Sequence, residues 1–412
     1  MRFKAAFILV TLILALTPDT SLAAIKAGTK CSKAGQISIS AGKQFTCIKK
    51  GKTLVWNAGK TIVQAAPRQS ASPTPMPIPT TEPSPSITVK SNPTVNVTPT
   101  PAGTPTPKAP TSFDDLVENY QGIPFAAWSK ARAKILQSTK AKTTLKMFIG
   151  PNSQLTYKEP LTPIDLVSRL YMGYAEDVQL NYLAFNFDDR DWAMDQMESI
   201  IPNAGNRWIK DVACATRTSC RGGGAFSNGN GTYLVVVALG SFDQNHTSGT
   251  LEAHEYVHIV QQMNIKRARP PVKFVLDPWP PDWYWEGQAQ FAQHATVYSD
   301  SFSTYMRERS SSSDQLFKDP VFTTEHIKNF FVFNAPEDWQ RKYEQWRVYD
   351  LGAMLIEILT AIKGPDATME LWKVASTGVK FEQAFEQVFG VQFQKVLPNI
   401  SKAIALQLGH EK

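Results

Sequence analysis

The sequence has few of the residues from which metal and redox sites are usually built. Its 412 residues include only 4 cysteines and 6 histidines, and no two cysteines have the C-x-x-C spacing of a cysteine zinc site. The glycine run 222–224 is not followed by Lys-Ser or Lys-Thr, which a phosphate-binding loop needs. Cysteine-bound zinc and nucleotide binding are therefore disfavoured.

Acidic residues are missing from the segment 24–65, which carries eight lysines and no aspartate or glutamate. The whole chain has a net charge of +7, and because residues 1–110 carry +11, residues 111–412 carry −4. A basic N-terminal segment would be drawn to anionic surfaces such as cell-wall polymers, unless its lysines form only an ordinary solvated face. We expect no nucleic-acid partner.

The first part of the chain predicts an exported protein. Residues 1–23 begin with Arg2 and Lys4, continue with the apolar run AAFILVTLILAL and end in small residues, which is typical of a secretory signal peptide. The alternative is a retained anchor, although the apolar run is short for a membrane span. We expect a protein that is secreted or extracellular, either free or associated with the cell wall.

Two further segments precede the main domain. Residues 24–65 alternate short apolar runs with Gly-Lys turns, which predicts a small β module. Residues 66–111 are rich in proline, serine and threonine, which predicts a disordered, extended linker. The four cysteines lie in two local pairs, Cys31 with Cys47 and Cys214 with Cys220. This local pairing is the simplest of three connectivities, and we expect two disulfides.

Residues 112–412 mix strand and helix patterns in an order typical of an α+β domain. Residues 214–230 are interpreted as a flexible loop, and 233–239 as a strand at the sheet edge along which an extended peptide can lie. The other elements that we expect are strands at 143–150 and 181–187, and helices at 113–137 (interrupted by Pro124), 163–174, 189–201, 248–264, 283–298, 301–310, 346–362, 367–376, 379–389 and 393–408.

The motif HEYVH, at 254–258, is the strongest chemical signal in the chain. On a helix, His254 and His258 lie on one face, one turn apart, so that both imidazoles can bind one metal ion. The Glu255 carboxylate can lie beside the same metal position and take a proton from the attacking water. The alternative is a buried helix with two hydrogen-bonded histidines.

A catalytic zinc ion needs a third protein ligand. The metzincin continuation is absent, because Gln261 and Asn264 stand where glycine and a third histidine would be required. Glu286, in the sequence WYWEG, lies on a second predicted helix and can supply the third ligand. As an alternative, Glu286 is a solvated acid near the start of its helix.

These motifs resemble the gluzincin clan of zinc metallopeptidases, the aminopeptidase-N and thermolysin-like group. The resemblance covers roughly 222–400 and implies a thermolysin-like catalytic domain with a mixed-sheet lobe and a helical lobe. It implies one Zn²⁺ ion bound by His254, His258 and Glu286, with Glu255 as general base. Tyr349 opens a Tyr-x-x-Gly element that, in relatives of aminopeptidase N, carries a catalytic tyrosine. The small basic module resembles Lys-rich, Cys-containing modules of exported actinobacterial proteins.

One motif departs from the aminopeptidase pattern. Gly-Ala-Phe-Ser-Asn at 224–228 stands where that family has Gly-Ala-Met-Glu-Asn, so Ser227 replaces the acid that holds a substrate's amino terminus. We therefore expect a secreted or surface-associated zinc peptidase that is not an aminopeptidase, acting as a monomer on peptide or protein substrates. A zinc hydrolase of other substrates and a non-catalytic surface-binding protein on the same scaffold remain alternatives.

Several further residues are interpreted less directly. Tyr343 and His294 are reserve candidates for the role of Tyr349, and Gln290, one turn after Glu286, is expected to orient a metal ligand from behind. The histidines without a motif around them are interpreted as incidental: His246, His326 and His410.

Overall fold

The computed structural model describes residues 26–31, 37–40, 43–61, 107–240, 245–266, 280–332 and 346–411. The chain divides into two compact units, Met1–Val97 and Thr98–Lys412. The predicted signal peptide and nearly all of the predicted linker lie outside the described residues. In the described part of the chain, no helix has the length and apolar character needed to cross a membrane.

The first unit contains a small antiparallel sheet. Strand β2 (Lys43–Lys50) pairs with all three other strands, which are β1 (Ile37–Ser40), β3 (Thr53–Trp56) and β4 (Lys60–Thr61). Phe45, Cys47 and Trp56 form its buried cluster. So small a core buries little apolar surface, and the Cys31–Cys47 disulfide adds a covalent constraint to it.

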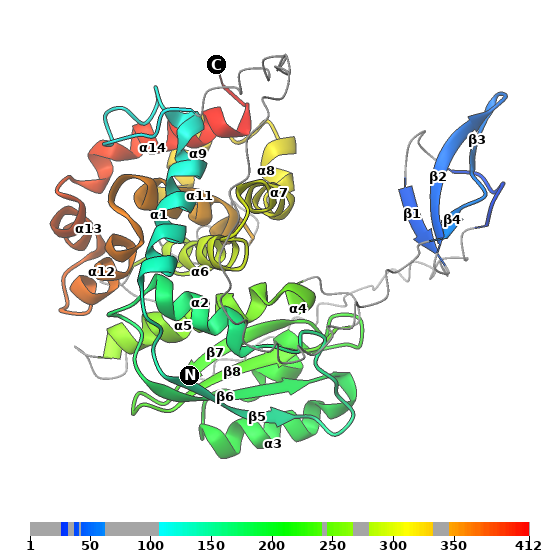
Figure 1. Cartoon of the computed structure of the whole chain (residues 1–412), viewed down its shortest axis with the longest axis horizontal. Coiled ribbons are helices and arrows are strands. Elements are labelled where there is room, and N and C mark those ends of the chain that lie inside the picture. The colour runs from blue at the N-terminus through cyan, green and yellow to red at the C-terminus, as the bar shows by residue number, and fades with distance from the viewer. Residues whose placement is uncertain are drawn as a thin grey trace, which may run out of the picture. The chain divides into compact units, whose positions relative to one another are not determined.

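The second unit is built around a four-stranded mixed sheet, which confirms the predicted α+β class (Figure 1). The strand order is β5 (Thr143–Ile149), β6 (Val178–Phe185), β8 (Tyr233–Ala238) and β7 (Gly222–Ser227). The first three strands are parallel, and β7 runs antiparallel to β8 at one edge. The second predicted disulfide, Cys214–Cys220, is also present, just before β7.

Strand β8 separates two layers of helix. Its odd-numbered residues, from Tyr233 to Val237, belong to the large core that includes α5 (Thr250–Lys266). Its even-numbered residues, from Leu234 to Ala238, belong to a second core with α3 (Arg190–Ile200). Because side chains alternate across a strand, a run of six apolar residues can fill both cores at once.

Two expectations for this sheet were wrong. Strand β8 is paired on both sides, by β6 and β7, so it is not an edge. The edge strand beyond it is β7, at the opposite edge from β5, where a flexible loop was expected. Glycine has low β propensity, so the glycine run carries no strand signal. Pairing with the strongly apolar β8 holds this glycine-rich segment extended in spite of its composition.

Helices form the rest of the second unit. Pro124 lies at the start of α1 (Ile123–Gln137), so it begins this helix and does not interrupt it. Among the described α-helices, three were not predicted, namely α4 (Asn245–Ser248), α8 (Asp314–Lys318) and α9 (Thr324–Val332). The other described α-helices not yet named are α2 (Leu161–Leu170), α6 (Asp282–Val297), α7 (Phe302–Ser312), α11 (Arg347–Lys363), α12 (Pro365–Ala375), α13 (Phe381–Phe389) and α14 (Phe393–Leu408).

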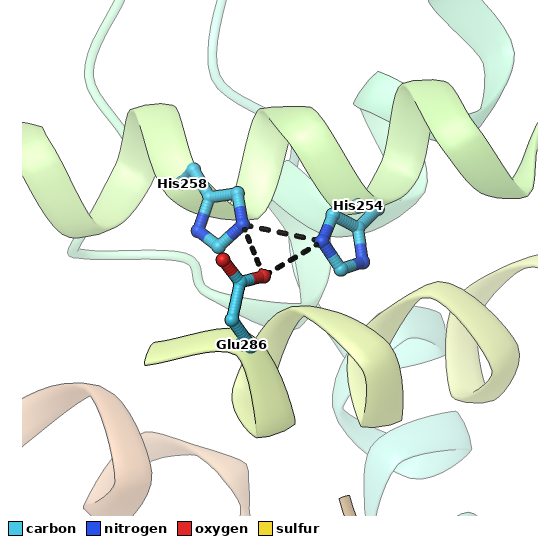
Figure 2. Close-up of side chains that lie close together, drawn as sticks. All are labelled: His254, His258 and Glu286. Carbon is cyan, nitrogen blue, oxygen red and sulfur yellow. Dashed lines mark hydrogen bonds and ion pairs between the residues drawn. The ribbon is translucent and has the colours of Figure 1, made fainter. Parts of the chain in front are cut away.

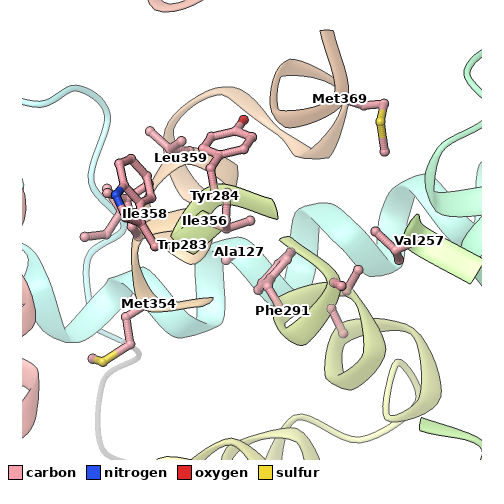
Figure 3. Close-up of a cluster of buried hydrophobic side chains, with 14 of the residues drawn as sticks. Ala127, Val257, Trp283, Tyr284, Phe291, Met354, Ile356, Ile358, Leu359 and Met369 are labelled. Atoms are coloured by element: carbon pink, nitrogen blue, oxygen red, sulfur yellow. The ribbon is translucent and has the colours of Figure 1, made fainter. Parts of the chain in front are cut away.

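Helices α6 and α11 pack against each other unusually closely. A Cβ atom added to Gly287 would lie 2.2 Å from the carbonyl carbon of Gly352, and one added to Gly352 would lie 2.1 Å from the Trp283 oxygen. Apolar side chains of both helices, including Trp283 and Met354, surround this crossing (Figure 3). The glycines of WYWEG and YDLG thus bring their neighbours Glu286 and Tyr349 to the same region.

Candidate metal centre

The two histidines of HEYVH lie on one face of α5, as their spacing predicts. This helix lies between the sheet and α6, and its residues from Thr250 to Gln261 are all buried. The Nε2 atoms of His254 and His258 are 3.2 Å apart (Figure 2). The long burial of α5 removes side-chain freedom, so both imidazoles are held in place before any ligand binds.

Glu286, on α6, completes a triangle with the two histidines. Its Oε2 atom lies 3.2 Å from Nε2 of His254 and 3.2 Å from Nε2 of His258. Ligands bound tetrahedrally to zinc at 2.0–2.1 Å lie about 3.3–3.4 Å from one another. The three atoms are therefore spaced as three corners of a zinc coordination tetrahedron, and the donor set is one that zinc prefers.

The hydrogen bonds behind the imidazoles show which ring nitrogens face the centre without a proton. His254 Nδ1 lies 2.9 Å from Gln293 Oε1, and His258 Nδ1 lies 2.8 Å from Gln261 Oε1. A carbonyl oxygen only accepts, so each Nδ1 donates and each neutral ring presents the lone pair of Nε2 to Glu286. Three acceptors at 3.2 Å from one another repel unless a cation lies between them.

The electrostatics of the centre also favour one positive charge. Burial alone would raise the pKa of Glu286, but His258 and His254 outweigh it and hold that pKa at about 2. Burial works against the charged form of His258, yet Glu286 and Glu255 raise its pKa above the usual value. A proton on His258 or a metal ion can each supply the charge that the carboxylates favour.

Glu255 points into the space between α5 and the edge strand β7. It is 5% exposed, and burial raises the pKa of its carboxyl although His254 and His258 favour the charged form. A Cβ atom added to Gly223 of β7 would lie only 2.7 Å from Glu255 Oε1. The glycine therefore leaves the room that this carboxylate occupies, and a carboxylate of raised pKa suits a general base.

Tyr349, on α11, lies beside the same cluster. Its ring stacks on His254 with the centroids 5.8 Å apart, and its hydroxyl contacts the Glu286 carboxylate. Burial raises the pKa of Tyr349, and the negative charges of Glu286 and Glu255 raise it further. The phenol thus stays protonated near neutral pH and remains a hydrogen-bond donor at the site.

The structure places the other candidates away from the triangle. His294 lies behind Gln293 with Nε2 3.1 Å from its amide nitrogen, and Gln290 has no recorded hydrogen bond to a ligand in the described residues. Tyr343 lies outside the described residues, as does the side chain of His246 on α4. His326 packs on Phe322, and His410 Nε2 lies 2.6 Å from the Leu316 oxygen.

Sequence reasoning missed the glutamines that contact the ligands. Gln290 was chosen for its place one turn after Glu286, but Gln293, two turns after it, contacts His254. Gln261, one turn after His258, contacts that histidine. Their spacing on the two helices was a usable signal, although five glutamines lie between 287 and 294 or just after HEYVH, and the spacing alone does not single out these two.

Comparisons with models of known protein families, with curated proteins and with solved structures find no match to this chain.

Proposed function

We propose that this protein is a zinc-dependent hydrolase of peptide bonds with a thermolysin-like catalytic domain of the gluzincin type. The observation that carries the proposal is the convergence of three hydrogen-bond acceptors, Nε2 of His254, Nε2 of His258 and Oε2 of Glu286, at 3.2 Å from one another. With both imidazoles neutral, each of these three atoms presents a lone pair to the others, and their spacing fits zinc. A free carboxylate, Glu255, stands beside them without being needed as a ligand.

A zinc ion at this centre would act as a Lewis acid, lowering the pKa of a bound water and polarising a substrate carbonyl. Glu255 accepts the proton of the attacking water and passes it to the leaving nitrogen. Tyr349, kept protonated by burial, donates a hydrogen bond to the oxygen on which negative charge develops. Burial of the cluster excludes bulk water and strengthens both interactions.

The edge strand β7 supports a peptide as substrate. The carbonyl oxygen of Ala225 accepts a hydrogen bond from Gln262 Nε2 at 3.2 Å, so it points away from β8. Alternate residues of an edge strand present their backbone groups on the same side, so Gly223, next to Glu255, presents its own. An extended peptide can pair with such groups. Ser227 offers no charge to an amino terminus, which favours cleavage away from it.

Digestion of a broad peptide library by the zinc-loaded full chain tests this function. Glu255→Gln keeps the side-chain shape and all three ligands, so we expect it to retain zinc and to lose at least about 100-fold in kcat. Tyr349→Phe is expected to retain zinc and to lose about 100- to 1,000-fold. Zinc binding without any turnover by the wild type, or turnover that survives Glu255→Gln, would refute the peptidase proposal.

For the N-terminal unit we propose binding to an anionic polymer outside the cell. Five of its lysines are exposed in the described residues: Lys26, Lys30, Lys49, Lys50 and Lys52. Its disulfide also suits an oxidising compartment. We expect the full chain to sediment with an insoluble anionic polymer and to be released by raised salt. Replacing these lysines by glutamine should abolish sedimentation, and unchanged sedimentation would contradict the proposal.

A further inference from the structure

Each histidine of the metal centre is held from behind by a glutamine, and one of these glutamines is held in turn by a buried chain of side chains. We propose that Gln261 and Gln293 are positioning residues that fix both imidazoles with Nδ1 protonated and Nε2 facing the metal. We further propose that Gln261 is oriented through Gln288 by Trp372 of α12. This inference rests on the proposed zinc site.

The amide of Gln261 can have only one orientation. Its nitrogen donates to the backbone oxygen of Trp285 at 3.1 Å and to Gln288 Oε1 at 2.9 Å. A backbone carbonyl accepts and never donates, so the amide nitrogen must face it. The oxygen of Gln261 is then left for His258 Nδ1, which has to donate to it.

The next member, Gln288, is fixed in the same way. Trp372 Nε1, which can only donate, lies 2.6 Å from Gln288 Oε1. Gln288 Nε2 donates to the Thr368 hydroxyl at 2.9 Å, and this hydroxyl donates to the Pro365 oxygen at 2.7 Å. We call this chain of hydrogen bonds, from Gln261 through Gln288 to Trp372 and Thr368, the relay. It ends at groups that have a single hydrogen-bonding role, the Trp372 N–H and the Pro365 carbonyl.

The members of this relay are also shielded from water. Gln261, Gln288 and Thr368 are 0% exposed and Trp372 is 1% exposed. Water cannot replace a broken bond there, so losing one partner leaves another polar group unsatisfied. The Trp285 ring, stacked on His258 at 4.7 Å, also packs on Trp372 at 5.2 Å, which ties the imidazole to α12 by a second path.

On the other side of the centre, Gln293 depends on His294. The Gln293 nitrogen lies 3.1 Å from His294 Nε2. Burial, together with the nearby positive charges of His254 and Arg309, lowers the pKa of His294 to about 3, so this ring is neutral and its Nε2 can accept. The Gln293 oxygen then faces His254 Nδ1. His294, which the sequence offered as a reserve catalytic candidate, is therefore assigned to holding the Gln293 amide in place.

A carboxylate could not replace Gln261, although carboxylates commonly stand behind metal-binding histidines. Glutamate at 261 would still accept from His258. It would, however, place an anionic oxygen against the Trp285 carbonyl and Gln288 Oε1, where the amide now donates to both. We therefore expect Gln261→Glu to weaken zinc binding, whereas a simple gain in imidazole basicity would strengthen it.

The test is the zinc dissociation constant of the full chain, measured by competition with a chromogenic chelator. We expect Gln261→Leu to weaken binding about 10- to 100-fold. Trp372→Phe keeps most of the ring packing and removes only the N–H donor, so we expect about a fivefold loss, equivalent to one neutral hydrogen bond. In one relay the losses do not add, so the double variant should match Gln261→Leu within about twofold. Gln290→Leu, on the same helix as Gln288, is the control and should bind like the wild type.

The outcomes separate this inference from the proposed function. Wild type that binds zinc no better than His258→Ala would overturn the zinc site and the relay together. Wild type that binds zinc, with Gln261→Leu and Trp372→Phe both indistinguishable from Gln290→Leu, would overturn the relay alone, as would losses that add in the double variant. If Gln261→Leu fails to fold, as judged by near-UV circular dichroism, Trp372→Phe and Gln261→Glu decide. The visible spectrum of the cobalt-substituted protein should change in the same variants, since it reports ligand geometry directly.

Discussion

At the scale of the residue, the position of the Glu255 carboxylate is set by a glycine on another element. Gly223 of β7 faces this carboxylate, and an added Cβ would come within 2.7 Å of its Oε1 atom. We expect Gly223→Ala to displace the carboxylate and to lower kcat by about 100-fold, as displacements near 1 Å can do. The zinc content should not change, because the three ligands lie elsewhere.

Gly224→Ala provides a matched control for that prediction. Its Cβ would meet the side chains of Phe226 and Trp208 and not Glu255. Steady-state kinetics and zinc analysis of both variants make the comparison. A loss of kcat in Gly224→Ala as large as in Gly223→Ala would show that β7, and not the base, is sensitive to an added methyl group.

At the scale of the element, the crossing of α6 and α11 brings Glu286 of the sequence WYWEG close to Tyr349 of the sequence YDLG. A Cβ at Gly287 would lie 2.2 Å from the Gly352 carbonyl carbon, a backbone atom that cannot turn aside. We expect Gly287→Ala to lower the free energy of unfolding by about 1–3 kcal/mol or more, as overpacking does. Zinc affinity should fall as well, because Glu286 is the adjacent residue.

Thermal unfolding and chelator competition measure these two effects. Gln290→Ala, three residues further along α6 and away from the crossing, is the control and should change neither by much. If Gly287→Ala leaves the stability and the zinc affinity of the protein unchanged, the two helices are not held at this distance by the glycine pair.

The first turn of α11 carries a buried acid whose titration affects stability. Burial raises the pKa of Asp350 to about 7, although Arg347, 3.4 Å away, favours the charged form. The folded protein thus keeps a proton that the unfolded chain releases near pH 4, and this contribution to stability is lost as the pH rises through about 7. We expect Asp350→Asn to show a smaller fall in Tm between pH 5 and pH 8 than the wild type. An equal fall in both proteins would contradict the assignment.

Helix positions and the three residues of the candidate metal centre were accessible from the sequence because both depend on local spacing. His254, Glu255 and His258 lie within one and a half turns of α5. The sequence WYWEG marks the start of the next helix, α6, which carries Glu286. Strand β7 was not accessible, because its glycines carry no strand signal and only pairing with β8 makes them extended. The relay through Trp372 joins residues 84 positions apart, so no local pattern could reveal it.

At the scale of the whole molecule, a bound zinc ion would couple the sheet layer to the helical layer. His254 and His258 lie on α5, which packs on the sheet, and Glu286 lies on α6, which packs on α11. A ligand that binds only the folded state stabilises it by about 2.7 kcal/mol at 100 times its dissociation constant. We therefore expect chelation to lower Tm and abolish activity together, and zinc to restore both. If added zinc restored neither Tm nor activity, this result would contradict a metal centre that joins the two layers.

The central claim is tested most directly by the number of zinc ions that the full chain holds in native mass spectrometry, compared with Glu286→Ala. Glu286 is the proposed ligand that comes from a separate helix, and it supplies the only negative charge among the three. The account predicts one zinc per chain in the wild type and none in Glu286→Ala under the same conditions. A wild-type chain without zinc, or a variant that keeps its zinc, would contradict it.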